Sequence, residues 1–156
     1  MKLNLFLVMI YNSTITLPGE IGVKKRIFLA GSMDINVTNT WRDSIINELY
    51  NTYDFFDPTI DNHDNLTDTQ MRNHILWELK ALELSDIVLL NLLPESKSPI
   101  SLIELRMYVK TNKLIVVCPK EFYTSRYLEE LCSYYKVDLY KSLPDFLNHF
   151  TRTNLN

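Results

Sequence analysis

The sequence is poor in glycine and cysteine, and each scarcity excludes a class of site. Only three glycines occur, Gly19, Gly22 and Gly31, whereas the Walker loop and the dinucleotide-binding fingerprint each need several glycines at fixed spacing. The two cysteines, Cys118 and Cys132, have neither metal-ligand nor disulfide-framework spacing. We therefore expect no glycine-rich phosphate cradle, and we expect both thiols to be buried and reduced, as in a cytoplasmic protein.

No charge of one sign dominates the chain either. Sixteen Lys and Arg stand against nineteen Asp and Glu, which gives a formal net charge of -3. A nucleic-acid polymer or an anionic membrane selects for a basic surface, so we expect neither as a partner. A small anionic ligand stays open, because one helix N-terminus can hold it.

The length and the start of the chain predict one cytoplasmic domain. A chain of 156 residues, 46% of them hydrophobic, suits a single globular domain with its own core. The apolar run over residues 3–10 has the outline of a signal sequence, but Asn4 interrupts it and no small-residue cleavage site follows. We predict one domain over residues 1–156, in which residues 1–24 form an extension with an extra strand.

Short apolar runs alternate with helical patterns, which is typical of an α/β domain with a parallel sheet. We predict strands over 26–30, 53–56, 86–92, 113–118 and 137–139, and helices over 39–52, 68–84, 99–112, 123–135 and 142–150. The pattern predicts a flavodoxin-like open sheet of five parallel strands in the order 2-1-3-4-5, with helices on both faces. Ligands of such sheets bind at the carboxyl ends of the strands, so we expect the chemistry in the loops after Ala30 and Leu92.

Glu104 is the first candidate for chemistry. It lies in the helix that follows the central strand, and the apolar Ile100, Ile103 and Met107 share its helical neighbourhood, so we expect it to border the buried face. Side chains on a helix lean toward its N-terminus, which here points at the crevice beyond the strands. The alternative is a solvated surface glutamate.

Glu78 is the second candidate, at the edge of an apolar arc on the helix over 68–84. The alternative is an exposed partner of Lys80 or His74. Asp86, which opens the central strand, fits a role in the turn between helix and strand better than a role in catalysis. The apolar arc beside Glu78, on the helix over 68–84, consists of Met71, Ile75, Leu79 and Leu82.

Other kinds of catalytic group are not indicated. His63, His74 and His149 have no ligand spacing among themselves, so we expect no metal site. No Gly-x-Ser-x-Gly elbow signals a serine nucleophile. Two carboxylates near one crevice point to glycosyl chemistry.

Several segments together resemble the nucleoside 2-deoxyribosyltransferase superfamily, in particular its small deoxyribosyltransferase-like branch, which is related to deoxynucleoside 5′-monophosphate N-glycosidases. The similarity spans about residues 18–136. It depends on the order and spacing of the matching segments and not on any single motif. The segments are IFLAGSM at 27–33, Trp41-Arg42, FDP at 56–58, ILWELKALELSDIVLLNL at 75–92 and SPISLIEL at 98–105.

The resemblance implies a flavodoxin-like fold and an enzyme that cleaves or transfers at the N-glycosidic bond of 2′-deoxynucleosides or their 5′-monophosphates. It implies that Glu104 is the nucleophile and that Glu78, eight positions before Asp86, orients or protonates the base. It implies no cofactor and no metal, a small-molecule substrate and a homo-oligomer, for which the N-terminal strand or the surface of Tyr123, Tyr127 and Tyr134 would serve. The residues expected to bind substrate are Gly31, Ser32, Asp34, Ser98 and Ser101.

The sequence departs from the family pattern at Arg106, where a glycine is usual, at Phe28, where tyrosine is common, and at Thr59. Ser98 favours a phosphate-bearing substrate, whereas Asp34 would repel a phosphate, so transferase and monophosphate hydrolase both stay open. A non-catalytic nucleotide-binding sensor on the same fold is the second class of function. A relative of NAD-cleaving domains, which also use one glutamate, is the third.

Overall fold

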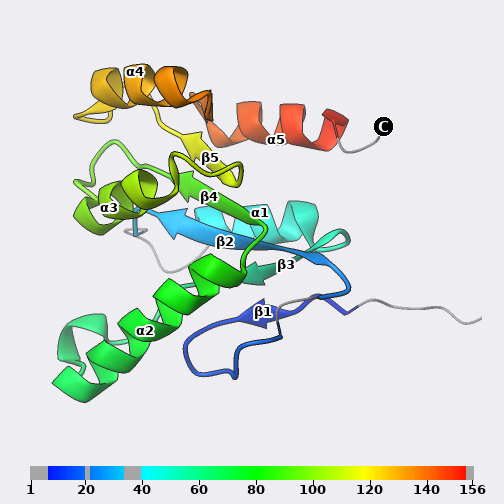
Figure 1. Cartoon of the computed structure of the whole chain (residues 1–156), viewed down its shortest axis with the longest axis vertical. Helices are drawn as coiled ribbons and strands as arrows, with labels where there is room; N and C mark the ends of the chain where they lie inside the picture. The colour runs from blue at the N-terminus through cyan, green and yellow to red at the C-terminus, as the bar shows by residue number, and fades with distance from the viewer. Residues whose placement is uncertain (1–6, 20–21, 34–39, 154–156) are drawn as a thin grey trace, which may run out of the picture. The chain divides into compact units, whose positions relative to one another are not determined.

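The computed structural model describes residues 7–19, 22–33 and 40–153. It is an α/β structure with an open six-stranded sheet in the order β1-β3-β2-β4-β5-β6 (Figure 1). The strands are β1 (Ile10–Tyr11), β2 (Lys25–Gly31), β3 (Tyr53–Phe56), β4 (Ile87–Asn91), β5 (Leu114–Val117) and β6 (Asp138–Tyr140). The helices are α1 (Trp41–Leu49), the short 3-10 helix η1 (His63–Asn65), α2 (Asp68–Leu84), α3 (Pro99–Tyr108), α4 (Ser125–Tyr135) and α5 (Leu143–Thr153).

This strand order confirms the flavodoxin-like prediction. The five predicted strands follow one another as expected, and the extra N-terminal strand is β1, which pairs with the outer side of β3. The described part of that strand is two residues long, and residues 1–6 lie outside the described residues. The contacts divide the chain into two units, residues 1–29 with 34–87 and residues 30–33 with 88–156. The single-domain organisation stays a prediction.

Unit 1 has the parallel strands β1, β3 and β2, with helices α1 and α2. Both helices begin at a threonine whose side chain accepts a backbone hydrogen bond within a capping box, Thr40 for α1 and Thr67 for α2. Trp77 of α2 lies against the fully buried Phe28 and Phe56, with ring centroids 6.5 and 6.4 Å away. These aromatic contacts fix α2 to the core of unit 1.

The end of α2 is joined to β2 by a reciprocal pair of hydrogen bonds. The Asp86 amide donates to the Arg26 carbonyl at 3.0 Å, and the Arg26 amide donates to a carboxylate oxygen of Asp86 at 2.9 Å. Asp86 therefore has the turn role that the sequence favours.

Unit 2 has the parallel strands β4, β5 and β6, with helices α4 and α5 contacting β6 (Figure 1). Its core is aliphatic in β4 and β5 and aromatic at Phe122 and Phe146, which are almost fully buried. Cys118 and Cys132 are buried here, and burial raises the pKa of each thiol to about 11. The predicted burial of both thiols is confirmed, and neither forms a disulfide within the described residues.

The faces that α2 and α3 bury differ from those predicted. Of the apolar arc expected to be inward on α2, Ile75 and Leu79 are exposed. On α3 the three apolar neighbours of Glu104 are all exposed as well: Ile100, Ile103 and Met107. The buried faces instead include polar groups, namely His74 on α2 and Ser101 and Glu104 on α3.

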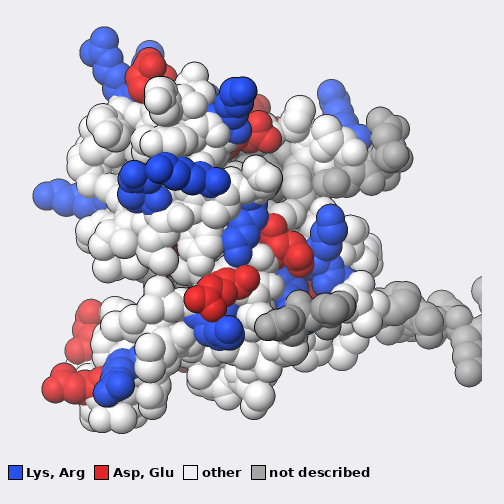
Figure 2. Space-filling view, viewed as in Figure 1, with Lys and Arg blue, Asp and Glu red and all other residues white. Residues whose placement is uncertain are grey.

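The surface shows no continuous basic stripe on the face drawn in Figure 2, where basic and acidic side chains are interspersed over wide uncharged areas. Among the helices of the described residues, none is long and apolar enough to cross a membrane.

Candidate active site

The buried carboxylate of unit 2 is Glu104. Its side chain is only 8% exposed, and it shares the inner face of α3 with Ser101, Leu105 and Tyr108. Arg106, two positions later, is exposed, so the helix turns this cation toward solvent while it turns Glu104 inward. Burial of a carboxylate is costly unless polar groups receive it, so a glutamate on the inner face of a helix marks a candidate site.

A cluster of serine hydroxyls lies before the start of α3. The Oγ atoms of Ser32 and Ser98 are 2.5 Å apart, and those of Ser96 and Ser98 are 2.7 Å apart. The Leu93 amide donates to the Ser32 hydroxyl at 2.9 Å. Ser98 stands at the N-cap position of α3, in a left-handed conformation with φ 46° and without a side-chain capping bond. Its hydroxyl is therefore engaged with the other serines rather than with the helix.

Gly31 allows β2 to approach the end of β4 closely. Its φ is 128°, and a Cβ atom added there would lie 2.0 Å from the Asn91 carbonyl oxygen. The same carbonyl accepts a hydrogen bond from the Ser32 amide at 2.8 Å. Any side chain at position 31 would push the Ser32 loop away from β4.

Asn91 is a polar residue that the sequence analysis did not single out. It is almost fully buried at the carboxyl end of β4, and its side-chain Nδ2 has no hydrogen-bond partner among the described residues. A buried donor without a partner is costly, and such groups are frequent where a ligand or water completes the bonding. In the sequence, the sign that Asn91 could belong to a site was its amide side chain within an otherwise apolar strand.

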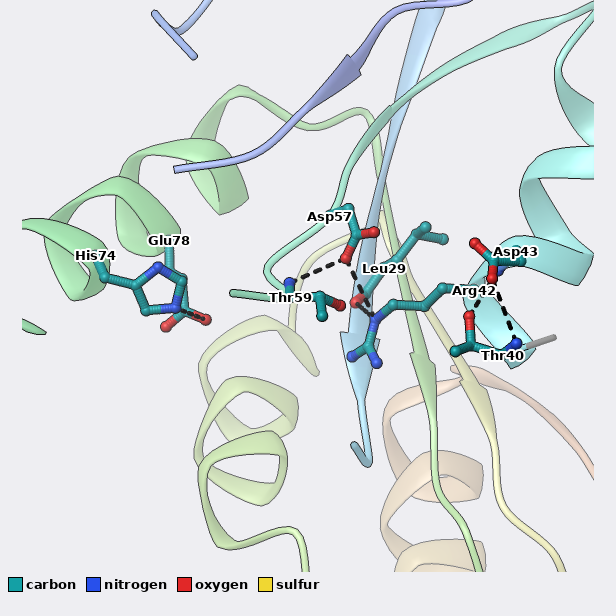
Figure 3. Close-up of polar contacts among 8 residues, drawn as sticks. All are labelled: Leu29, Thr40, Arg42, Asp43, Asp57, Thr59, His74 and Glu78. Atoms are coloured by element: carbon teal, nitrogen blue, oxygen red, sulfur yellow. Dashed lines mark hydrogen bonds and ion pairs between the residues drawn. The ribbon is translucent and has the colours of Figure 1, made fainter. Parts of the chain in front are cut away.

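The candidate carboxyl of unit 1 is that of Glu78 on α2, a half-buried side chain that is 20% exposed (Figure 3). Its Oε1 lies 3.4 Å from Nε2 of His74, one helical turn earlier, while Lys80 pairs with Glu83 instead. Burial raises the pKa of the Glu78 carboxyl above its usual value, and the charges of His63 and Arg42 oppose that shift. Glu78 thus holds its proton to higher pH than a solvated glutamate does.

His74 is itself 4% exposed, and its ring lies parallel to that of Trp77, with the centroids 6.3 Å apart. Burial, and secondarily the charge of His63, lowers the pKa of the His74 imidazole. Its Nδ1 finds no hydrogen-bond partner within the described ranges. The lowered pKa favours the neutral form of the imidazole beside Glu78.

Arg42 is a buried cation of unit 1 whose burial the sequence did not reveal. Its Nε donates to the Leu29 carbonyl at 3.1 Å and lies 3.8 Å from Oδ1 of Asp57, the residue that follows β3 (Figure 3). Its guanidinium also lies 4.4 Å from the ring centroid of Trp41. Arg42 links α1 to the ends of β2 and β3, and it supplies positive charge to the region around Glu78.

The match to a family of known proteins decides the classification. The family model described as nucleoside 2-deoxyribosyltransferase like matches residues 24–122, more than half of the chain. The chain belongs to the nucleoside 2-deoxyribosyltransferase-like family. No curated protein matches the sequence.

The family match includes every residue predicted to act on substrate. The structure brings Gly31, Ser32 and Ser98 together in unit 2 and places Ser101 on the face of α3 that carries Glu104. Asp34 lies outside the described residues. The nucleoside 2-deoxyribosyltransferase-like segment ends before α4, so α4, β6 and α5 lie beyond it. Within the part of the chain that the structure describes, no group of three or more His, Cys, Asp or Glu could hold a metal ion.

Proposed function

We propose that this chain cleaves the N-glycosidic bond of 2′-deoxynucleosides or their 5′-monophosphates and passes the deoxyribosyl group to water or to a second base. The observation that carries this proposal is the burial of Glu104 on α3, within the segment that matches the family. A buried carboxylate suits a reaction whose transition state resembles an oxocarbenium ion.

Glu104 would act as the nucleophile. Its carboxylate attacks the anomeric carbon, the bond from that carbon to the base nitrogen breaks, and the bonding electrons leave with the base. The product is a glycosyl ester of Glu104. Water or an acceptor base then attacks the same carbon, loses a proton and releases the carboxylate. Water gives free deoxyribose or its 5-phosphate, and an acceptor base gives a new deoxynucleoside or its monophosphate.

Glu78 would act on the departing base. The burial that raises the pKa of Glu78 supports an acid that keeps a proton to donate to the base nitrogen as negative charge develops there. His74 supports this role, because its neutral ring fills the space beside Glu78 without adding a second charge.

The serine cluster would hold the sugar or its phosphate. We assign substrate binding to Gly31, Ser32, Asp34, Ser98 and Ser101. The linked hydroxyls of Ser32 and Ser98 favour a ligand with oxygen acceptors, which suits a sugar hydroxyl and a phosphate equally.

The test is a base-release assay with the wild-type protein. It is incubated with each deoxynucleoside, alone and with an acceptor base, and with each deoxynucleoside monophosphate, and free and exchanged bases are separated by chromatography. Base exchange supports the transferase, and release from monophosphates alone assigns the hydrolase.

The Glu104→Gln variant distinguishes an enzyme from a sensor. In an enzyme, this variant loses turnover but still binds the substrate in calorimetry. Ligand binding by the wild type without turnover of any deoxynucleoside or monophosphate would refute the proposal in favour of the sensor, and release of nicotinamide from NAD would favour the third class.

A further inference from the structure

We propose that Asn91, at the carboxyl end of β4, donates a hydrogen bond to the sugar of the substrate. This role rests on the proposed function and deepens it, because it specifies which part of the deoxynucleoside meets the buried polar groups of unit 2. All the residues involved belong to that unit, which consists of residues 30–33 and 88–156.

The side chain of Asn91 is a buried donor without an acceptor. It is 2% exposed, and its Nδ2 has no hydrogen-bond partner among the described residues. Residues 87–90 before it are apolar, and so is its neighbour on β5, Val117. An unpaired amide in such surroundings costs stability, whereas a leucine of similar size would not. Asn91 therefore makes the ligand-free protein less stable, and a cost of this kind is typical of a residue that serves binding.

Asn91 lies where ligands of open parallel sheets bind. It is the last residue of β4, and its backbone carbonyl accepts the hydrogen bond from the Ser32 amide at 2.8 Å. The Ser32 hydroxyl lies 2.5 Å from that of Ser98, at the N-cap of α3. Ser101 and Glu104 then follow on the inner face of α3. A continuous set of contacts thus links Asn91 to the helix that carries the proposed nucleophile.

The buried polar side chains of unit 2 suit a sugar better than a phosphate. Besides Tyr108, whose ring belongs to the core, those within the described ranges are Ser32, Asn91, Ser101 and Glu104. They supply hydroxyls, an amide and a carboxylate, and no described lysine or arginine of unit 2 is buried with them. A buried phosphate needs a cation, because removing its charge from water is costly and a nearby carboxylate repels it. The hydroxyl and ring oxygens of a sugar need only such neutral donors and acceptors.

Deoxynucleosides and their 5′-monophosphates have the same sugar. A donor that binds the sugar therefore contributes equally to the binding of both kinds of substrate. A donor that binds the phosphate contributes to the binding of monophosphates alone. The effect of removing the Asn91 amide on matched pairs of substrates thus shows which group it binds.

The Asn91→Leu variant removes the donor and nearly keeps the volume. Its KM should rise by about tenfold for each substrate that the wild type cleaves, and by the same factor for a deoxynucleoside and its monophosphate. Without ligand, its midpoint of thermal unfolding should rise by about 2 °C or more, because the unpaired amide is gone. Asn112→Leu, at an exposed asparagine of the same unit, is the matched control and should leave KM unchanged.

The Asn91→Asp variant separates binding from stability. It keeps the shape of the side chain but replaces the donor with an acceptor, so KM should rise at least as much as in Asn91→Leu. Its midpoint of thermal unfolding should fall, because a second carboxylate is buried in unit 2 beside that of Glu104. A rise of KM in both variants, with opposite changes in stability, assigns the effect to the lost donor.

An unchanged KM in Asn91→Leu, or a rise for monophosphates alone, would overturn the proposal. A lower unfolding midpoint in Asn91→Leu would overturn it as well, since the amide would then be paired in the free protein. If the wild type releases no base from any substrate, the proposed reaction fails, and calorimetry with 2′-deoxyadenosine and its 5′-monophosphate decides the role of Asn91. An equal loss of affinity for both ligands in Asn91→Leu upholds that role. Unchanged affinity, or no binding by the wild type, refutes it.

Discussion

The two candidate carboxylates have different surroundings, one in each unit. Glu104 of unit 2 lies on a helix face next to a serine, and the loop before its helix carries linked hydroxyls. Glu78 of unit 1 lies beside the imidazole of His74, which stacks on Trp77, and the buried Arg42 contributes positive charge. Polar surroundings suit a carboxylate that works ionised, and apolar surroundings suit one that works protonated. The raised pKa of Glu78 is the difference on which its proposed role as an acid depends, whereas the nucleophile role proposed for Glu104 depends on its burial and on the family resemblance.

The largest effect is expected from Glu104→Gln. Loss of the proposed nucleophile should lower kcat by about 1,000-fold or more, since the proposed mechanism passes through a glycosyl ester of this side chain. Steady-state base release measures it, with the exposed Glu48→Gln as the matched control. A loss below about tenfold would remove Glu104 from the nucleophile role.

The Gly31→Ala variant tests the close approach of β2 to the end of β4 beside the serine cluster. The added Cβ overlaps the Asn91 carbonyl and the φ of 128° disfavours an alanine, so the free energy of unfolding should fall by about 3 kcal/mol or more. Gly19→Ala is the control, because nothing lies within 4 Å of a Cβ there. Urea unfolding measures both, and equal stability of the two variants would contradict the close approach.

Glu78→Gln should lower kcat by about 10- to 100-fold, because an amide keeps the shape but cannot donate an acidic proton. It should also change the pH dependence of stability. The folded pKa of Glu78 is raised, so the wild type loses stability as pH rises through it, and the variant does not. Thermal unfolding from pH 4 to 8 should therefore show the variant gaining on the wild type as pH rises. A constant difference would mean that Glu78 is not buried as described.

His74→Phe gives the smallest and most specific effect. The phenyl ring keeps the packing on Trp77 but removes Nε2 beside Glu78, so the Glu78-dependent limb of the pH–rate profile should move to higher pH. His74→Gln, which keeps a donor, should move it less, and the exposed His149→Phe should not move it. A limb that stays in place in His74→Phe would separate His74 from the chemistry.

Local signals made most of the fold predictable. The helix over 68–84 and the strand over 53–56 have the bounds that were predicted. In the structure Thr67 caps the helix, and Asp57-Pro58 follows the strand. The inward faces of α2 and α3 were predicted wrongly. Apolar periodicity assumes that a helix buries its apolar residues, whereas these helices bury His74 and Glu104.

The same limit applies to the polar residues of the site. Glu104, Glu78 and the serines could be predicted as site residues because the helix and strand pattern gives their places in the fold and the family resemblance implies their roles. The burial of Arg42 and Asn91 depends on contacts between segments far apart in the chain, such as that between Arg42 and the Leu29 carbonyl. Single-sequence patterns carry no information on those contacts.

The two-residue strand β1 covers the outer border of β3. The Phe55 and Asp57 amides donate to Met9 and Tyr11, and a carboxylate oxygen of Asp54 accepts from the Met9 amide in place of a longer strand. These bonds occupy hydrogen-bonding groups along the border of β3. A strand of two residues also offers few backbone groups with which another chain could pair. The outer edge that β1 forms is therefore short, and short edge strands are one way in which natural sheets avoid pairing edge to edge with another chain.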